Sequence, residues 1–298
     1  MKKQKNEAEK TSRKQISREI TTRILSVVIS IFVLFCVVVA VMIGNTSLSA
    51  QKDELELQSA GASYQMETFF KKYSTIVDQM AMNPDIINLV EGTKAGDDIT
   101  KAPMYKEVFS DLQKDQEYDG DNILAAWVGD IDANVLTQSD GYTSDDTFEI
   151  TERAWYTAAS EQTTMFTNAY TDASTGKLIL SAAAPIYDKS GKNVTGVAGL
   201  DIALDHINEL FADYKVGNTG FVILLNEDGT IIYHPNSDNQ MKNLSDISVS
   251  DQVIDALNNK EDTSLKYKAS GQTKYGYITN ISDTNFYVLS CLPSKEYH

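Results

Sequence analysis

The sequence predicts an α+β fold with one N-terminal transmembrane helix, a long stalk helix, and two tandem modules built on antiparallel sheets. Three observations predict it. An uncharged apolar stretch follows a basic N-terminus, and a heptad-like apolar repeat follows that stretch. From about residue 118, two similar groups of short strands are separated by acidic turns and helices. At 298 residues, the chain has room for one large domain or two modest ones.

The first element is a basic tail followed by a membrane span. Residues 1–23 carry eight Lys/Arg and three Glu, whereas residues 24–43 (ILSVVISIFVLFCVVVAVMI) carry no charge and can cross a bilayer as one helix. A cleaved signal peptide is the alternative, because small residues stand at 47–50. Its apolar core usually has only ~7–15 residues, so an uncleaved anchor is favoured. The positive-inside rule keeps the basic tail cytoplasmic and predicts that the chain after about residue 45 is extracytoplasmic.

The charge of the remaining chain excludes some partners. Residues 24–298 carry 18 Lys/Arg and 39 Asp/Glu, a net charge of −21. Nucleic acid is therefore not an expected partner, since its phosphates require basic residues, and broad docking on an anionic lipid surface is also disfavoured. Cys36 lies in the predicted span and Cys291 near the C-terminus, so the external part has no intradomain disulfide and needs a stable core of its own.

A stalk helix is predicted over residues 45–83. Pro84 marks its end, because proline disfavours helix in the preceding residue. Apolar residues recur at alternating intervals of four and three, as in a coiled-coil seam: Ala62, Met66, Phe69, Tyr73, Ile76 and Met80. Two interpretations stay open. The helix packs on its own domain, or it pairs with a second copy of the chain and makes a homodimer.

Two modules are predicted beyond the stalk, over residues 84–216 and 217–293. A helix is expected at 102–116, and further helices at 203–215 and 248–259. The segments AAWVGDIDANVLTQ and GFVILLNEDGTIIYHP each give a strand, an acidic turn and a second strand, and each group closes with a hairpin. The last residues, 294–298, are expected to begin a link to a second span.

Catalytic and metal-binding motifs are missing from the sequence. The three histidines (His206, His234 and His298) are widely spaced and have no Cys or His partners, as a zinc site would require. The acidic clusters EYDGDN and DGYTSDD lack the terminal Glu of a calcium loop, and no nucleophile elbow, HExxH or phosphate loop occurs. No cofactor, metal site or catalysis is therefore expected in these residues.

One segment, TERAWYTAASEQTTMFTNAYTD (residues 151–172), gathers the groups that a zwitterion needs. Arg153 can hold a carboxylate bidentately, and the indole N–H of Trp155 is a donor suited to the same group. Asp172 can accept from an ammonium, as can Asp201, which follows the apolar run VTGVAGL, where an isolated carboxylate is costly unless paired. Each residue taken singly also has an ordinary structural interpretation. Arg153 can form a surface ion pair, Trp155 can pack in the core, and Asp201 can cap the end of a strand.

The ordered set R-x-W-Y, Y-x-D and a later Asp, after a membrane span and a long helix, resembles the double Cache extracytoplasmic sensor domains of bacterial chemoreceptors, sensor kinases and cyclic-dinucleotide enzymes. It is most similar to the subfamily that binds free amino acids. The resemblance implies two PAS-like Cache modules, with the ligand in the membrane-distal one (84–216). The ligand contacts that it implies are Arg153, Trp155, Tyr170, Asp172 and Asp201, with Phe148 and Tyr156 as further candidates.

One position departs from the pattern of that subfamily. Phe148 stands where the subfamily has a tyrosine, so the aromatic wall is kept while one hydroxyl donor is lost. The resemblance thus predicts a homodimeric sensor in the bacterial plasma membrane that binds a zwitterionic amino acid. Because the chain stops at LPSKEYH, where relatives enter a second span, we expect a fragment of a receptor with its output domain missing, or else a stand-alone module that acts through a partner.

Two other function classes stay open at this point. A sensor of an amine, a nucleobase or an organic acid can use the same fold, and an amine would leave Arg153 without a role. A membrane-tethered structural or adhesion domain with a vestigial pocket is the second alternative.

Overall fold

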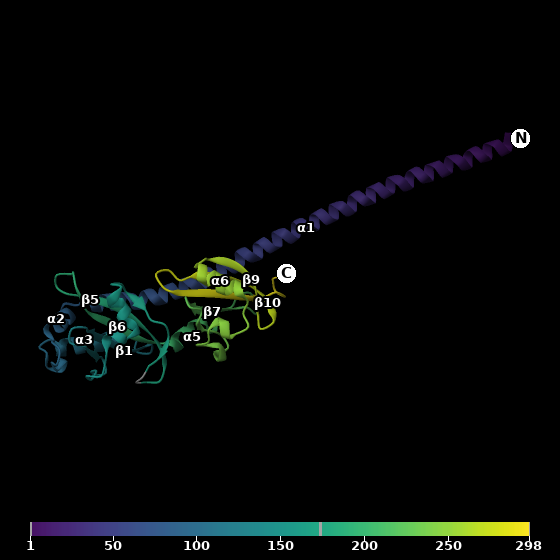
Figure 1. Cartoon of the computed structure of the whole chain (residues 1–298). Coiled ribbons are helices and arrows are strands. Elements are labelled where there is room, and N and C mark those ends of the chain that lie inside the picture. Colours follow the sequence, from purple (N-terminus) through teal and green to yellow (C-terminus); the bar gives the residue numbers. More distant parts are fainter. Residues whose placement is uncertain (1, 173–174, 298) are drawn as a thin grey trace. The chain divides into compact units, whose positions relative to one another are not determined.

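The computed structural model describes residues 2–172 and 175–297, and the chain forms two compact units. The smaller unit ends at Glu54, and the larger one is Leu55–Tyr297. Helix α1 (Lys2–Ala81) runs through the smaller unit, and its last part belongs to the larger one (Figure 1). The long N-terminal apolar helix predicted from the sequence is confirmed.

The smaller unit has the surface of a membrane-spanning helix. It contains a stretch that is apolar and long enough to cross a bilayer, and large side chains such as Phe32 and Leu34 are 64% and 65% exposed. Apolar surface of this extent is costly in water, so lipid is its natural solvent.

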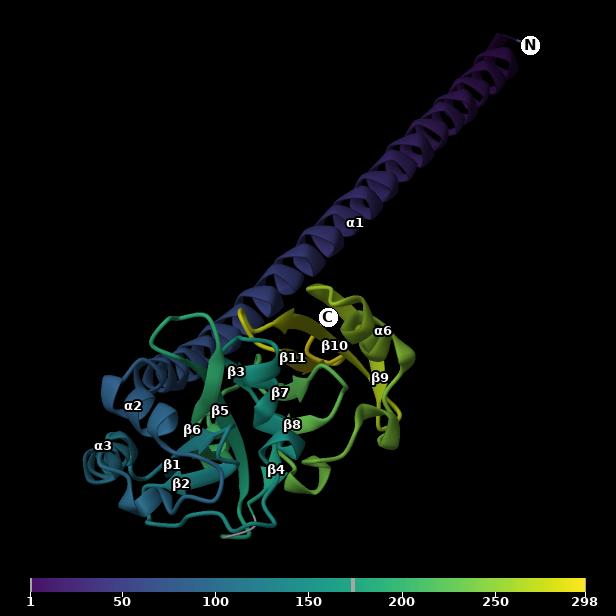
Figure 2. The ribbon, with the colours of Figure 1, turned by 60° about the vertical axis from the view of Figure 1, so that its left-hand side comes forward.

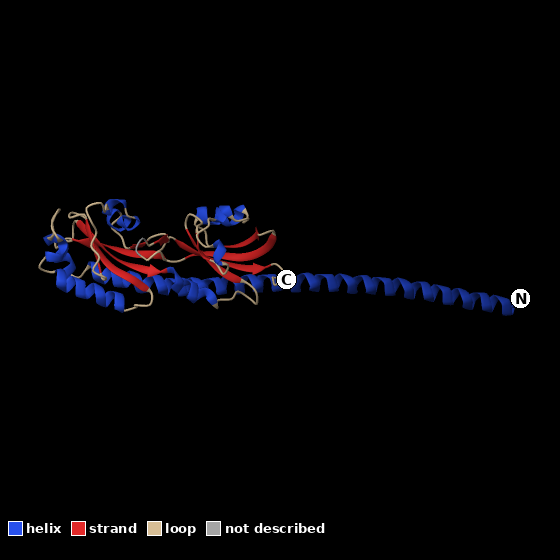
Figure 3. Cartoon of the chain, turned by 90° about the horizontal axis from the view of Figure 1, so that it is seen from below, coloured by secondary structure: helices blue, strands red, loops and turns tan. Residues whose placement is uncertain are grey.

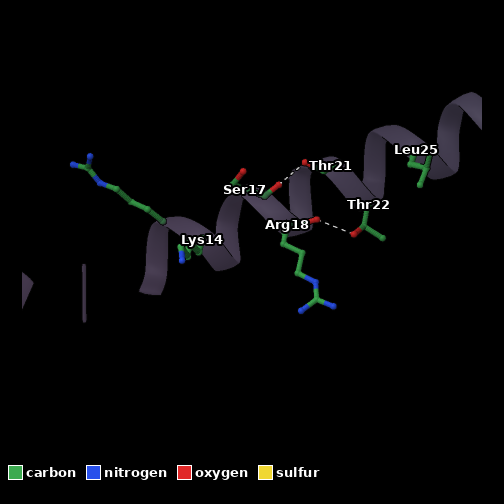
Figure 4. A pocket seen from close by; sticks show the side chains of 7 residues that line it. Lys14, Ser17, Arg18, Thr21, Thr22 and Leu25 are labelled. Carbon is green, nitrogen blue, oxygen red and sulfur yellow. Dashed lines mark hydrogen bonds between the residues drawn. The ribbon is translucent and has the colours of Figure 1, made fainter. Parts of the chain in front are cut away.

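The helix that leads into this stretch satisfies its own polar groups. The hydroxyls of Thr21 and Thr22 donate to the carbonyls of Ser17 and Arg18, at 2.8 and 2.7 Å (Figure 4). The Arg18 side chain points away from the helix. The residues that line the shallow pocket in Figure 4 all belong to this one helix. It is therefore no candidate for a ligand site.

From residue 55 onward, α1 packs against the rest of the larger unit. Five of the six predicted seam residues are buried in the core formed with both sheets: Ala62, Met66, Phe69, Tyr73 and Met80. Ile76 is half-buried, and Leu55, which extends the seam by seven residues, is buried as well. The interpretation of a helix packed on its own domain therefore holds for this part of α1. Two apolar residues seven positions apart, Leu57 and Tyr64, lie outside the seam and are 72% and 70% exposed.

A second helix, α2 (Pro84–Gly92), begins almost where α1 ends, and the sequence analysis did not predict it. The Asn83 side chain caps it by accepting from the backbone N–H of Asp85 at 2.9 Å. Pro84 lies in the first turn, where a missing N–H costs nothing. The proline that stops one helix thus starts the next.

The first module is built on a six-stranded antiparallel sheet of order β2-β1-β6-β5-β3, with β4 paired to β5. Its strands are β1 (Ile123–Asp130), β2 (Val135–Gln138), β3 (Met165–Phe166), β4 (Tyr170–Thr171), β5 (Leu178–Tyr187) and β6 (Val194–Ala203). Strands β1, β5 and β6 are nearly continuous apolar runs, because both faces of the sheet are covered.

Helices cover the two faces of this sheet differently (Figure 3). One face packs on α1, α2, α3 (Tyr105–Glu117) and α5 (Leu204–Ala212). Short helices lie over the opposite face: η2 (Ile150–Glu152), η3 (Ala154–Tyr156) and α4 (Thr157–Ser160). A further short helix, η1 (Ile99–Lys101), precedes α3.

The second module repeats this order in a five-stranded antiparallel sheet, β8-β7-β11-β10-β9 (Figure 2). Its strands are β7 (Phe221–Asn226), β8 (Ile231–Tyr233), β9 (Thr263–Ala269), β10 (Gln272–Asn280) and β11 (Phe286–Pro293). Its helices are η4 (Ser237–Asn239), η5 (Leu244–Asp246) and α6 (Asp251–Asn259). One face contributes to the core around α1, and α6 covers the other. The predicted α+β fold with two antiparallel sheets is confirmed.

Candidate ligand-binding site

A cavity of about 660 Å³ opens on the face of the first sheet that is turned away from α1. The structure brings six of the seven predicted site residues to its wall: Phe148, Arg153, Trp155, Tyr170, Asp172 and Asp201. Tyr156 is the exception. It is not among the lining residues, and it packs against the apolar cluster around Trp155.

The floor of this cavity is made by two indoles that lie over glycines. Trp127 on β1 is buried, and its ring lies so close to Gly199 on β6 that a Cβ there would meet it at 2.2 Å. Trp155 likewise lies over Gly129, where an added Cβ would come within 3.0 Å of the ring. The two ring centroids are 4.6 Å apart. Trp127 was not predicted as a site residue, because its place in an apolar strand is typical of an ordinary core residue.

Asp201 on β6 is held at the bottom of the cavity by two donors. Its Oδ1 accepts from the indole N–H of Trp127 at 2.9 Å and from the hydroxyl of Ser181 at 2.6 Å. Ser181 lies directly opposite on β5. Its hydroxyl also lies 2.6 Å from that of Tyr170. Among the described residues, no hydrogen bond is made to Oδ2 of Asp201, which leaves that oxygen for a ligand.

This network fixes the direction of the Tyr170 hydroxyl. Ser181 has one hydroxyl proton, which an ionised Asp201 takes, so the contact between Tyr170 and Ser181 requires Tyr170 to donate. The Tyr170 oxygen is then an acceptor toward the cavity. Burial and the nearby charge of Asp201 raise the pKa of Tyr170, so the hydroxyl stays neutral at physiological pH.

The proton affinity of Asp201 is raised by its position. Burial raises its pKa to about 6, against the opposing effect of the bonds from Ser181 and Trp127, and the charge of Asp172 adds to the increase. An incoming cation would favour the ionised form. A bound ammonium group would therefore keep the Asp201 carboxylate ionised.

Asp172 follows β4 and presents a second carboxylate. Its Oδ2 accepts from the backbone N–H and the hydroxyl of Thr175, at 2.7 and 2.6 Å. These bonds fix the side chain, and Oδ1 accepts no hydrogen bond from residues 2–172 or 175–297.

Arg153 lies at another part of the wall, over an aromatic ring. Its guanidinium carbon is 3.9 Å from the ring centroid of Phe148, a cation–π contact. It makes no hydrogen bond or ion pair within residues 2–172 and 175–297, so its donors are free for an anion. Asn134 holds this wall, since its side chain donates to the carbonyl of Phe148 at 2.7 Å and accepts from the N–H of Ile150 at 3.0 Å.

The cavity therefore has two poles of opposite character. At one is the guanidinium of Arg153, which has no hydrogen bond or ion pair among the described residues. At the other are the carboxylates of Asp172 and Asp201 and the hydroxyl of Tyr170, whose proton is directed to Ser181. Three residues of the segment after β1 also line it: Gln138, Asp140 and Tyr142. This arrangement suits a small molecule that carries an anionic and a cationic group and has a further polar side.

The Cache domain family profile matches residues 42–297 of the chain. Among curated proteins, the chain is 35% identical over 95 residues to the methyl-accepting chemotaxis protein PscA of Pseudomonas syringae, and this match covers 32% of the chain and 15% of PscA. It is 31% identical over 140 residues to McpC of Bacillus subtilis, which covers 46% of the chain and 21% of McpC. The matches thus span only a small part of these relatives' length.

Solved structures share the fold at low sequence identity. The ligand-binding domain of the Pseudomonas fluorescens chemoreceptor CtaA, in complex with L-isoleucine, has a TM-score of 0.62 and 20% identity, covering 85% of this chain and 96% of its own. That of the Pseudomonas aeruginosa receptor PctB, with L-Arg, has a TM-score of 0.60 and 19% identity, covering 82% and 88%. The profile match over most of the chain and the two tandem antiparallel modules lead to one assignment: the chain belongs to the Cache domain family, as a double Cache protein.

Proposed function

We propose that the chain is the sensor part of a transmembrane signalling receptor and that its first module binds a free amino acid. The observation that carries this proposal is the two-pole cavity. One free guanidinium can take a carboxylate, and three oxygen-bearing side chains can take an ammonium. The chemotaxis relatives and the amino-acid complexes of CtaA and PctB support it.

In the proposed complex, the ligand carboxylate binds the guanidinium of Arg153 and the indole N–H of Trp155. The ammonium binds Oδ2 of Asp201, Oδ1 of Asp172 and the hydroxyl oxygen of Tyr170. Two carboxylates on one ammonium leave neither as an acid or base, so the site holds its ligand without transforming it. The ligand side chain faces the polar group around Gln138 and Tyr142.

We further propose that the protein acts as a homodimer in the bacterial plasma membrane, with its basic N-terminus in the cytoplasm and both modules outside. The seam of α1 from Leu55 to Met80 is used within the chain, so pairing has to use another face. Leu57 and Tyr64 supply exposed apolar surface on that helix. Ligand binding would favour a closed form of the first module and shift α1 against its partner.

The proposal is tested with the full chain in nanodiscs, by thermal shift and calorimetry against the proteinogenic amino acids. We expect at least one of them to raise the midpoint of unfolding, and Asp172→Ala to weaken its binding. Asp205→Asn is the matched control, because Asp205 is an exposed carboxylate on α5 that is not among the lining residues of the cavity. If no amino acid stabilises the protein, or if Asp172→Ala binds as well as the wild type, the proposal is wrong.

Arg153→Ala separates an amino acid sensor from an amine sensor on the same fold. A zwitterion needs the guanidinium, so its affinity should fall by roughly ten- to a hundredfold, as for the loss of a charge-assisted hydrogen bond. Unchanged binding of the stabilising ligand in this variant would instead identify an amine sensor.

A further inference from the structure

The second module has a cavity of its own, of about 280 Å³. Strand residues that line it, such as Ile223, Tyr267 and Leu289, belong to the cluster on the face that is turned away from α1. The first module has its ligand cavity on the corresponding face of its sheet. The repeat therefore places two cavities at equivalent positions, and the proposed amino acid site occupies only one of them.

A lysine reaches this second cavity from the sheet itself. Side chains alternate along β10, so Lys274 lies on the same face as Gly276 and the buried Ile278. Its ammonium is 4.7 Å from the ring centroid of Phe221. Within the described parts of the chain, Lys274 forms no ion pair with any carboxylate and no hydrogen bond, and its side chain is only partly exposed.

A histidine adds a neutral donor beside this lysine. His234 follows β8, and its ring centroid lies 5.2 Å from that of Phe221. Its Nδ1 accepts from the backbone N–H of Asn236 at 2.9 Å, so a neutral ring carries its proton on Nε2. Burial, with the charge of Lys274, lowers the pKa of His234, which keeps the ring neutral.

Among the described residues, one carboxylate lines this cavity, that of Asp246, and it forms no ion pair with Lys274. Asp246 is exposed, and its Oδ2 accepts from the backbone N–H of Asn243 at 3.3 Å in a capping box. Deeper in the cavity, the residue at the ladder position of Asp201 is Cys291. Asp201 pairs with Ala125 near the start of β1, and Cys291 pairs with Phe221 at the start of β7.

Cys291 cannot replace a carboxylate toward an ammonium. Its sulfur accepts from the hydroxyl of Tyr267 at 2.8 Å, and burial raises the pKa of the thiol to about 11, so it is neutral. The second cavity thus keeps a cation over a phenylalanine, as Arg153 lies over Phe148, and has a neutral thiol in place of the buried carboxylate of Asp201.

We propose that the second module binds a small monocarboxylate whose anionic group is held by Lys274 and His234 and whose short apolar tail packs on Leu289. A water molecule takes about 30 Å³ of liquid volume, so the cavity has room for roughly six to nine non-hydrogen atoms. A free amino acid would find one exposed carboxylate there, that of Asp246, in place of the two carboxylates of the first cavity, so its ammonium would be held less well.

The test uses the full chain in nanodiscs of zwitterionic lipid and calorimetry with three probes that share a short alkyl chain: butyrate, butyramide and n-butylamine. Butyrate should bind, and the neutral amide and the amine should bind at least about tenfold more weakly, because they lose the charge-assisted bonds. Lys274→Met should abolish butyrate binding, Lys274→Arg should retain it, and Arg153→Ala should leave it unchanged.

The proposal is overturned if butyrate does not bind, if butyramide binds equally well, or if Lys274→Met keeps full affinity. It is also overturned if Arg153→Ala removes the binding, since butyrate would then occupy the first cavity. Circular dichroism checks the fold of each variant. Should Lys274→Met fail to fold, Lys274→Gln keeps a polar side chain of similar length and must show the same loss.

Discussion

Each module places a cation over a phenylalanine ring on the corresponding face of its own sheet, and the two modules differ at the ladder position of Asp201. Arg153 lies over Phe148 in the first module, and Lys274 lies over Phe221 in the second. At the position where the first module has Asp201, the second has a buried thiol. The fold thus supplies a cavity twice, with a carboxylate in the last strand of the first module and a neutral thiol at the same position of the second.

The floors of the two cavities follow the same physical rule with different residues. Gly199 leaves room for the Trp127 indole. In the second module, Gly276 lies beneath the ring of Tyr267, and a Cβ there would come within 3.0 Å of that ring and within 2.2 Å of the Ser290 carbonyl. Each aromatic side chain therefore needs a glycine on the adjacent strand.

The substitution Asp201→Asn tests this difference between the modules most directly. The variant keeps an oxygen for the bonds from Trp127 and Ser181 and removes the charge that meets the ammonium. Amino acid binding should weaken by about 2–5 kcal/mol, as for a truncated buried charge pair. Calorimetry of the full chain measures this loss. Butyrate binding in the second module should be unaffected, and a ligand affinity within twofold of the wild type would contradict the assignment of Asp201.

The pH dependence of stability should also separate the modules. The pKa of Asp201 is raised to about 6, above the value near 3.9 of an unfolded chain, so between these pH values the folded state binds the proton more tightly. The free energy of unfolding should therefore fall as pH rises through this window, by about 3 kcal/mol from Asp201 alone. Cys291, with a pKa of about 11, contributes nothing there.

Urea unfolding at pH 4, 5, 6 and 7 measures this slope. Burial also raises the pKa of Asp130, to about 7, and that of Asp115, to about 6, so the wild type carries their slopes as well. The difference between the wild type and Asp201→Asn isolates the contribution of Asp201. Equal slopes in the two proteins would show that Asp201 titrates normally. A bound amino acid should reduce the slope, because its ammonium favours the ionised carboxylate.

Gly199→Ala should damage the first cavity and spare the second. The added methyl group meets the indole of Trp127, which must move, and overpacking of this kind costs about 1–3 kcal/mol. Gly92→Ala at the end of α2 is the matched control, since a Cβ there has no neighbour within 4 Å among the described residues. Urea unfolding measures the loss of stability, and calorimetry measures the loss of amino acid affinity. A loss of stability equal to that of the control would mean that the indole is not confined.

The sequence was sufficient for the parts of this site that lie close together in the chain. Arg153, Trp155, Tyr170 and Asp172 fall within one short segment, and Asp201 stands out because it follows the apolar run VTGVAGL. Trp127 and Ser181 could not be found in this way. Each lies in an apolar run, and only the strand register brings them to Asp201.

The same distinction applies to the fold. Long strands and α3 were predicted because their apolar periodicity is strong, and α3 begins within three residues of the expected start. Strands β3 and β4 have two residues each, too few for a periodic signal. Helix α2 was missed because the sequence alone does not tell whether Pro84 ends one helix or starts another.

The smallest effect is expected from a change to the phenylalanine ring that lies under a cation in each module. Phe148→Tyr keeps the ring face that Arg153 covers and adds the hydroxyl that the amino-acid-binding subfamily has at this position. One more donor toward the ligand carboxylate should tighten amino acid binding by about 0.5–1.5 kcal/mol, a gain of roughly two- to tenfold. Phe221→Tyr is its counterpart under Lys274 and should leave amino acid affinity unchanged. If Phe148→Tyr does not tighten binding, the ring edge points away from the carboxylate, and the missing hydroxyl does not limit affinity in this protein.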